Sequence, residues 1–144
     1  MRGFQVLDYA ARYVHEVKRR PTRSTGGRAS GPPVDRLRAI CLALPEATEK
    51  IAHGEPTWRA GGKMFAQLDD HHHGADRLAV WLAAGLGDQE HLVTSDPKRF
   101  FVPPYVGHRG WIGVRIDVRP AWRLVATLVR DAYVQVAPKR LLSR

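Results

Sequence analysis

The stretch "GGKMFAQLDDHHHGADRLAVWLA", residues 61–83, contains two segments in which a core-forming apolar residue recurs at every second position. Gly61-Gly62 suits the two-residue turn of a β-hairpin, because glycine readily adopts the positive φ angles that such turns require. Beyond it, apolar residues occupy every second position on both sides of the polar turn 69–76, at Met64, Ala66 and Leu68 and then at Leu78, Val80 and Leu82. This period is typical of half-buried strands. The stretch therefore predicts antiparallel β-strands.

The flanking regions have the period of helices instead. Apolar residues between Pro33 and Pro45 follow helical spacing, at Val34, Leu37, Ile40, Cys41 and Leu44. A second set ends before Pro138, at Trp122, Val125, Val129, Ala132, Tyr133 and Val136. Within residues 87–101 the sequence predicts a short polar helix or turn that ends at Asp96-Pro97, and residues 111–116 predict one more strand. This order predicts an α+β fold, an antiparallel sheet packed by N- and C-terminal helices.

The positive charge is concentrated in the N-terminal part of the chain. Its 144 residues suit one folded domain, and the formal net charge is +9. Residues 1–33 hold seven Lys or Arg against two acidic residues, while residues 34–144 hold sixteen against twelve. We predict a basic N-terminal extension over 1–33, with a short amphipathic helix and a flexible linker, followed by the domain 34–144. A basic protein favours polyanionic partners.

The composition also indicates a compartment. No apolar run is long enough for a membrane span, and Asp8, Arg12 and His15 interrupt any signal-peptide core. Cys41 is the single cysteine, so no internal disulfide can form. We expect a cytoplasmic protein without membrane contact, and a monomer.

Motifs for catalysis or cofactors are incomplete. His53-Gly54-Glu55 has the H-x-E form of zinc deaminases but lacks a downstream P-C-x-x-C. The glycines of "GGKM" lack the spacing of a phosphate loop, and no Cys/His or serine nucleophile signature occurs. The histidines 71–73 beside Asp69 and Asp70 predict a solvated hairpin tip, with adventitious metal as the alternative. We predict no enzyme, no catalytic residue, no metal site and no cofactor.

The second face of the predicted sheet is not simply polar. Opposite the apolar positions, three strands carry aromatic and basic residues: Lys63, Phe65 and Gln67; Arg77, Ala79 and Trp81; Trp111, Gly113 and Arg115. Exposed rings beside cations would form a stacking platform for single-stranded nucleic acid. Alternatively, a helix or the corner 100–110 covers these rings, which is the more common situation of aromatic side chains.

Four segments together resemble the MmcQ/YjbR family across residues 34–142. They are "LALPEATEKIAHGEPTWRAGGKMFA" (42–66), "RLAVWL" (77–82), "DPKRFFVPPYVGHRGWIGVRID" (96–117) and "DAYVQVAPKRL" (131–141). The resemblance implies a compact double-wing α+β fold similar to type III secretion chaperones, a DNA-binding role, and no catalytic residues. The recurrent family positions would be Pro45, Gly54, Lys63, Met64, Phe65, Pro103, Tyr105, Trp111 and Tyr133.

Two hypotheses of function follow. In the first, the domain binds DNA or another nucleic acid through basic surface residues, which we predict to be Lys63, Lys98, Arg99, His108, Arg109, Lys139 and Arg140. In the second, it is a small-molecule or protein-interaction module with no nucleic-acid role. Its pocket would then be lined by Trp58, Phe65, Tyr105, His108 and Trp111.

Overall fold

The computed structural model describes residues 33–143. The basic extension and linker predicted before Pro33 lie outside them. Six antiparallel strands form one sheet in the order β1-β2-β3-β4-β6-β5. The strands are β1 Thr48–Ala52, β2 Glu55–Ala60, β3 Lys63–Asp70, β4 Leu78–Leu82, β5 Phe100–Phe101 and β6 Ile112–Arg115. The predicted hairpin at Gly61-Gly62 is confirmed, since it joins β2 to β3.

Four helices accompany the sheet. They are α2 Pro33–Leu42, α3 Asp88–Ser95, α4 Trp122–Val136 and α5 Lys139–Leu142, with short 3-10 turns η1 His72–Gly74 and η2 Gly107–Arg109. The two predicted amphipathic helices are confirmed as α2 and α4. The sequence pattern did not indicate β5 and α5, which are only two and four residues long. Within the described part of the chain, no helix is long and apolar enough to span a membrane.

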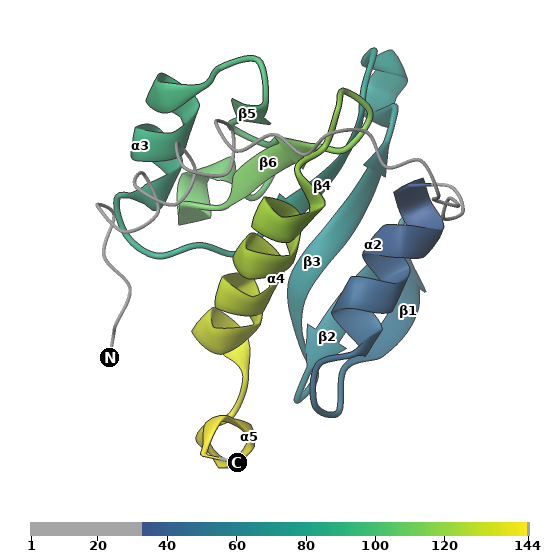
Figure 1. The fold of residues 1–144 in the computed structure, drawn as a ribbon. Helices are drawn as coiled ribbons and strands as arrows, with labels where there is room; N and C mark the ends of the chain where they lie inside the picture. The colour runs from purple at the N-terminus through teal and green to yellow at the C-terminus, as the bar shows by residue number, and fades with distance from the viewer. Residues whose placement is uncertain (1–32, 144) are drawn as a thin grey trace.

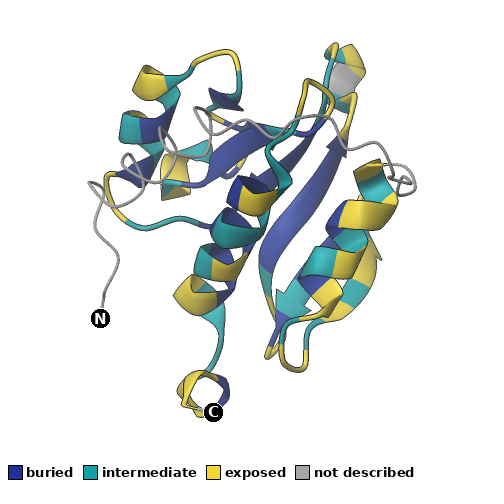
Figure 2. Ribbon diagram, viewed as in Figure 1, coloured by how far each residue is buried: buried dark blue, intermediate teal, exposed yellow. Residues whose placement is uncertain are grey.

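The sheet has a helix-covered face. Helices α2 and α4 lie across it, and α3 lies beside β5 and β6 (Figure 1). The sides of α4 and β3 that meet are buried (Figure 2). Helix α4 contributes Leu124, Val125, Leu128, Val129 and Ala132 to this core. The α+β class with an antiparallel sheet is therefore confirmed.

A bulge in the β2–β3 ladder changes the face on which Phe65 lies. Trp58 pairs with Ala66, but the next residue, Arg59, pairs with Met64, so Phe65 has no partner. Because such an irregularity interrupts strict alternation, Phe65 joins the helix-covered face. Its ring meets that of Tyr133 on α4 edge to face, with centroids 5.6 Å apart. The prediction that Phe65 lies on the second face is wrong.

Candidate nucleic-acid interface

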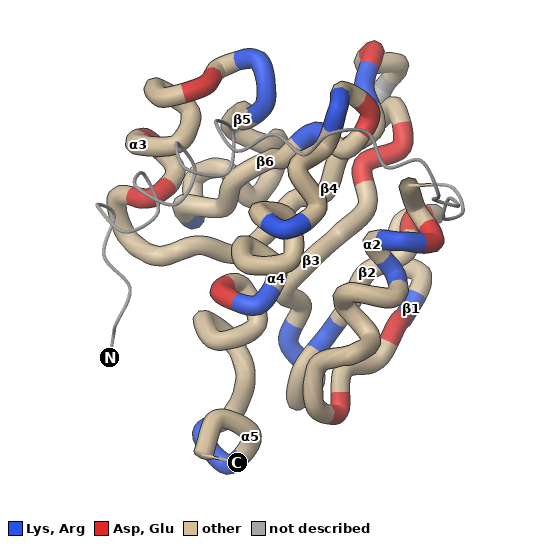
Figure 3. The backbone as a smooth tube through the Cα atoms, in the orientation of Figure 1, with Lys and Arg blue, Asp and Glu red and all other residues tan. Residues whose placement is uncertain are grey.

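Two segments that are far apart in the sequence, the β2–β3 hairpin and the residues around Pro138, meet beside the Gly61-Gly62 turn. An ideal Cβ placed on Gly61 would lie 2.7 Å from Cδ and Cγ of Pro138, so the hairpin packs directly against the residue that precedes α5. Arg59 and Lys63 flank the hairpin, and Lys139 and Arg140 begin α5. We call these four residues the basic end. Figure 3 shows basic segments at this hairpin and on α5, apart from the basic turn that follows α3.

Most of the charge at the basic end is not neutralised by the described acids. Arg140 forms a two-pronged pair with Glu46, with N–O distances of 3.0 and 3.1 Å. Arg59 donates weakly from Nη1 to the carbonyl of Gly62 at 3.5 Å. Lys63 and Lys139 are exposed, and neither forms an ion pair with an acid in residues 33–143. Three of the four cations therefore lack a described carboxylate partner.

The predicted residues Lys98 and Arg99 lie elsewhere, in the turn between α3 and β5. The Asp96 carboxylate accepts hydrogen bonds from the backbone N–H groups of both, at 3.2 and 3.3 Å. Arg99 also donates from Nη1 to the carbonyl of Arg119 at 3.1 Å. Arg99 is therefore held within the fold, whereas Lys98 is exposed.

His108 and Arg109 belong to a third location, the η2 turn that precedes β6. Gln89 of α3 anchors this turn by donating to the carbonyls of Gly107 and Trp111 at 2.8 and 2.7 Å. The Arg109 guanidinium lies 5.4 Å from the centre of the Trp111 ring. Both His108 and Arg109 are exposed, but the length of β6 separates them from Arg99. The structure thus brings together Lys63, Lys139 and Arg140, but not the other four residues predicted to bind nucleic acid.

The second face of the sheet does not expose its rings. Trp81 and Trp111 are only 1% and 3% exposed. The Trp81 ring contacts His72 of η1 and Tyr105 of the 102–110 corner, at centroid distances of 5.3 and 6.4 Å. For Trp81, the alternative in which the corner covers the ring is therefore confirmed, with η1 as a second cover. Tyr105, which belongs to the corner and not to the sheet, is itself 63% exposed.

Most of this domain matches a known protein family. The YjbR family model matches residues 42–135, from the end of α2 to near the end of α4. The chain belongs to the YjbR family. The match confirms the resemblance found in the sequence, and it includes Lys63 but not Lys139 or Arg140.

A solved structure supports the fold of this YjbR domain. The crystal structure of the Deinococcus radiodurans protein DR2400, with the family-model domain DUF419, is similar with a TM-score of 0.61. The sequences are 24% identical, and the similarity covers 73% of this chain and 80% of that chain. No curated protein matches the chain.

The residues of the alternative ligand pocket do not converge in the YjbR domain. Trp58 and Phe65 are fully buried on the helix-covered face, where Trp58 Nε1 donates to Glu49 at 3.0 Å. Trp111 lies on the opposite side of the sheet, and Tyr105 and His108 are exposed. These five residues are therefore divided between the helix-covered core, the second face of the sheet and the surface.

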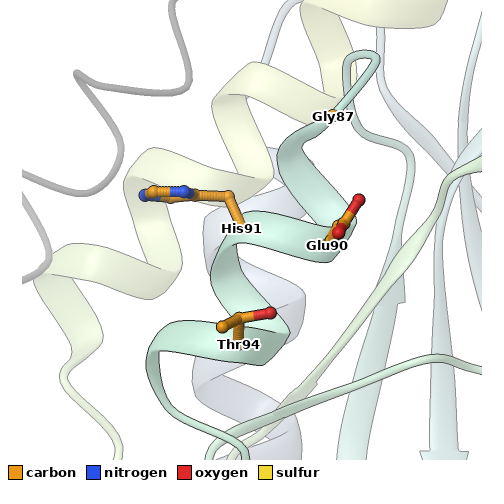
Figure 4. A pocket seen from close by; sticks show the side chains of 4 residues that line it. All are labelled: Gly87, Glu90, His91 and Thr94. Atoms are coloured by element: carbon orange, nitrogen blue, oxygen red, sulfur yellow. The ribbon is translucent and has the colours of Figure 1, made fainter.

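A depression on α3 contains none of those five residues. It measures about 320 Å³ and is lined by Gly87, Glu90, His91 and Thr94 (Figure 4). Beside it, burial raises the pKa of Asp88 to about 6, and Asp131 adds to the shift. No three His, Cys, Asp or Glu residues within 33–143 are grouped to hold a metal ion. Sequence patterns did not indicate this depression, because Glu90 and His91 form no recognisable motif.

Proposed function

We propose that this YjbR domain binds nucleic acid without catalysis, through the basic end. The observation that carries the proposal is the contact between Gly61 and Pro138, which gathers Lys63 and Lys139 from segments far apart in the sequence. Lys and Arg side chains contact phosphate oxygens irrespective of base sequence. The role that the MmcQ/YjbR resemblance implies, DNA binding, agrees with this assignment.

The state of the buried reactive groups supports binding rather than catalysis. Asp69 accepts three hydrogen bonds from within the fold, from the N–H of His72, Arg77 Nε and Trp81 Nε1. Cys41 is fully buried, and burial raises the pKa of its thiol far above the usual range. Neither group is therefore poised as a base or nucleophile. A lone, buried cysteine also agrees with a reducing, cytoplasmic setting.

The test is fluorescence anisotropy of labelled single- and double-stranded DNA at two salt concentrations. The full chain is compared with Lys63→Ala/Lys139→Ala. The double variant should bind several-fold more weakly. On double-stranded DNA, the slope of log affinity against log salt should become shallower by about 0.9 for each phosphate that the variant no longer neutralises.

Two control variants locate the binding surface. Lys98→Ala/Arg109→Ala removes the same charge at other predicted positions and should leave the salt slope unchanged. Lys18→Gln/Arg19→Gln/Arg20→Gln tests the charge of the N-terminal extension. If only that triple variant loses binding, the extension carries the interaction and the proposed surface is wrong.

A further inference from the structure

Strand β1 forms one edge of the sheet, and no other strand within residues 33–143 pairs with its outer side. It pairs with β2 on one side only. Thr48, Lys50 and Ile51 of the strand are exposed, and so is His53, which begins the turn after it. Ile51 is 60% exposed, so its side chain presents apolar surface beside this edge. Unpaired edges of this kind are templates for pairing with another strand.

The turn after β1 determines which backbone groups face outward. His53 and Gly54 form a two-residue connection between the paired residues Ala52 and Glu55, with φ angles of 52° and 81°. In such a hairpin the residues flanking the turn exchange backbone hydrogen bonds, and every second pair does the same. Thr48, Lys50 and Ala52 therefore direct their N–H and C=O groups toward β2.

Two observations agree with this assignment. Thr57 of β2 donates from Oγ1 to the Lys50 carbonyl at 2.7 Å, so that carbonyl faces β2. Pro56, which has no N–H, lies opposite Ile51, where no ladder bond is needed. The backbone groups of Glu49 and Ile51 thus point to the open edge. No backbone bond from residues 33–143 outside the strand ladders reaches them.

We propose that β1 pairs antiparallel with β1 of a second copy of this chain, centred on Ile51. Symmetric pairing requires residues that face outward to lie opposite one another. Centring on Glu49 would place two carboxylates opposite each other, and centring on Lys50 would place two ammonium groups in the closer type of pair. Centring on Ile51 brings two exposed isoleucines together and places Lys50 opposite Ala52 and Glu49 opposite His53.

The resulting dimer has one continuous sheet across both copies. It replaces the expectation of a monomer and does not depend on the nucleic-acid proposal, since the basic end takes no part in it. The interface is short, so the association belongs to the weak class of protein contacts.

Sedimentation equilibrium over a wide concentration range tests the association. The full chain should form a reversible dimer, and Ile51→Lys should weaken it at least tenfold by placing like charges at the centre. Val118→Lys is the matched control, because Val118 is a similarly exposed residue at 48% and lies outside the sheet. A monomer at every concentration, or an equal weakening in both variants, would overturn the proposal.

Mixed disulfides test the register. The pair of Lys50 with Ala52 of the second copy is the closer, non-hydrogen-bonded type, with Cα atoms about 4.5 Å apart, a distance that suits a disulfide. Oxidising a mixture of Lys50→Cys and Ala52→Cys proteins should yield chiefly the mixed dimer, identified by intact mass. The native Cys41 is buried and does not compete. A predominance of Lys50→Cys homodimers would indicate centring on Lys50 and overturn the Ile51 register.

Discussion

Asp69 is a buried carboxylate on the second face of the sheet, and its neighbours determine what that face can do. Trp81 Nε1 donates to Asp69 Oδ2 at 2.8 Å, and Arg77 Nε donates to the same oxygen at 3.2 Å. The Arg77 guanidinium also lies 3.8 Å from the centre of the Phe101 ring. Because buried polar groups need partners, these contacts orient the Trp81 ring inward and keep it from solvent.

Asp88 gives the protein a pH-dependent stability at the scale of one side chain. Burial raises its pKa to about 6 from the ordinary 3.8, so the folded state binds this proton more tightly than the unfolded chain. The unfolding free energy contributed by Asp88 should therefore fall as the pH rises from about 4 to about 6. Asp88→Asn should remove this fall and should stabilise the protein at neutral pH by on the order of 1 kcal/mol.

Urea denaturation at about pH 4 and about pH 6 measures the unfolding free energy of the Asp88→Asn variant and of the original chain. The amide oxygen can still accept the N–H of Gly85, which donates to Asp88 Oδ2 at 3.2 Å. A variant whose stability changes with pH as steeply as the original chain would contradict the assignment.

Tyr133 links helix α4 to the loop after α2. Its hydroxyl donates to the carbonyl of Pro45 at 2.7 Å, across most of the domain sequence. Tyr133→Phe keeps the ring contact with Phe65 and removes only the donor. We expect a decrease of about 1 kcal/mol in the free energy of unfolding, measured by chemical denaturation. Full retention of stability would show that water replaces the missing donor.

At the scale of elements, the β2–β3 hairpin and α5 depend on each other. Both glycines of the turn have positive φ, 62° at Gly61 and 85° at Gly62. They differ in surroundings, because an added Cβ would meet the Pro138 ring at Gly61 and nothing within 4 Å at Gly62. The hairpin thus requires glycine at Gly61 for conformation and for contact.

Alanine at the two turn positions separates these requirements. Both substitutions strain the left-handed backbone, at a cost of about 1–2 kcal/mol. Gly61→Ala should cost about 1 kcal/mol more than Gly62→Ala, because the proline ring must also move. Denaturation midpoints of the two variants provide the comparison, and equal costs would show that α5 shifts away without penalty. Only Gly61→Ala should also weaken DNA binding.

At the scale of the whole molecule, the sheet has a protected centre and exposed edges. Strands β3 and β4 each pair on both sides, and α4 packs over them. Strand β1 pairs on one side only, and β5 has two residues. The domain therefore has its most persistent structure along β3, β4 and α4.

Amide hydrogen exchange should follow this order. Amides within β3, β4 and α4 should exchange only through global unfolding, while those of β1 should exchange through local opening. Exchange at low protein concentration, monitored residue by residue, provides the measurement. Equal protection of β1 and β3 in the dilute protein would contradict this order.

The sequence alone determined the β2–β3 hairpin, strands β4 and β6, the two long helices and the family, because alternating and helical periods are properties of each element's own backbone. It also placed Lys63, Lys139 and Arg140 among the candidate cations. Only the tertiary structure decided that these three meet and that Lys98 and Arg109 lie elsewhere, since the contact of Gly61 with Pro138 joins distant segments. The same holds for Phe65, whose face depends on the pairing partner of Arg59, and for Trp81, whose burial depends on the corner that folds over it. Periodicity describes what one element presents, whereas packing between elements determines what remains exposed.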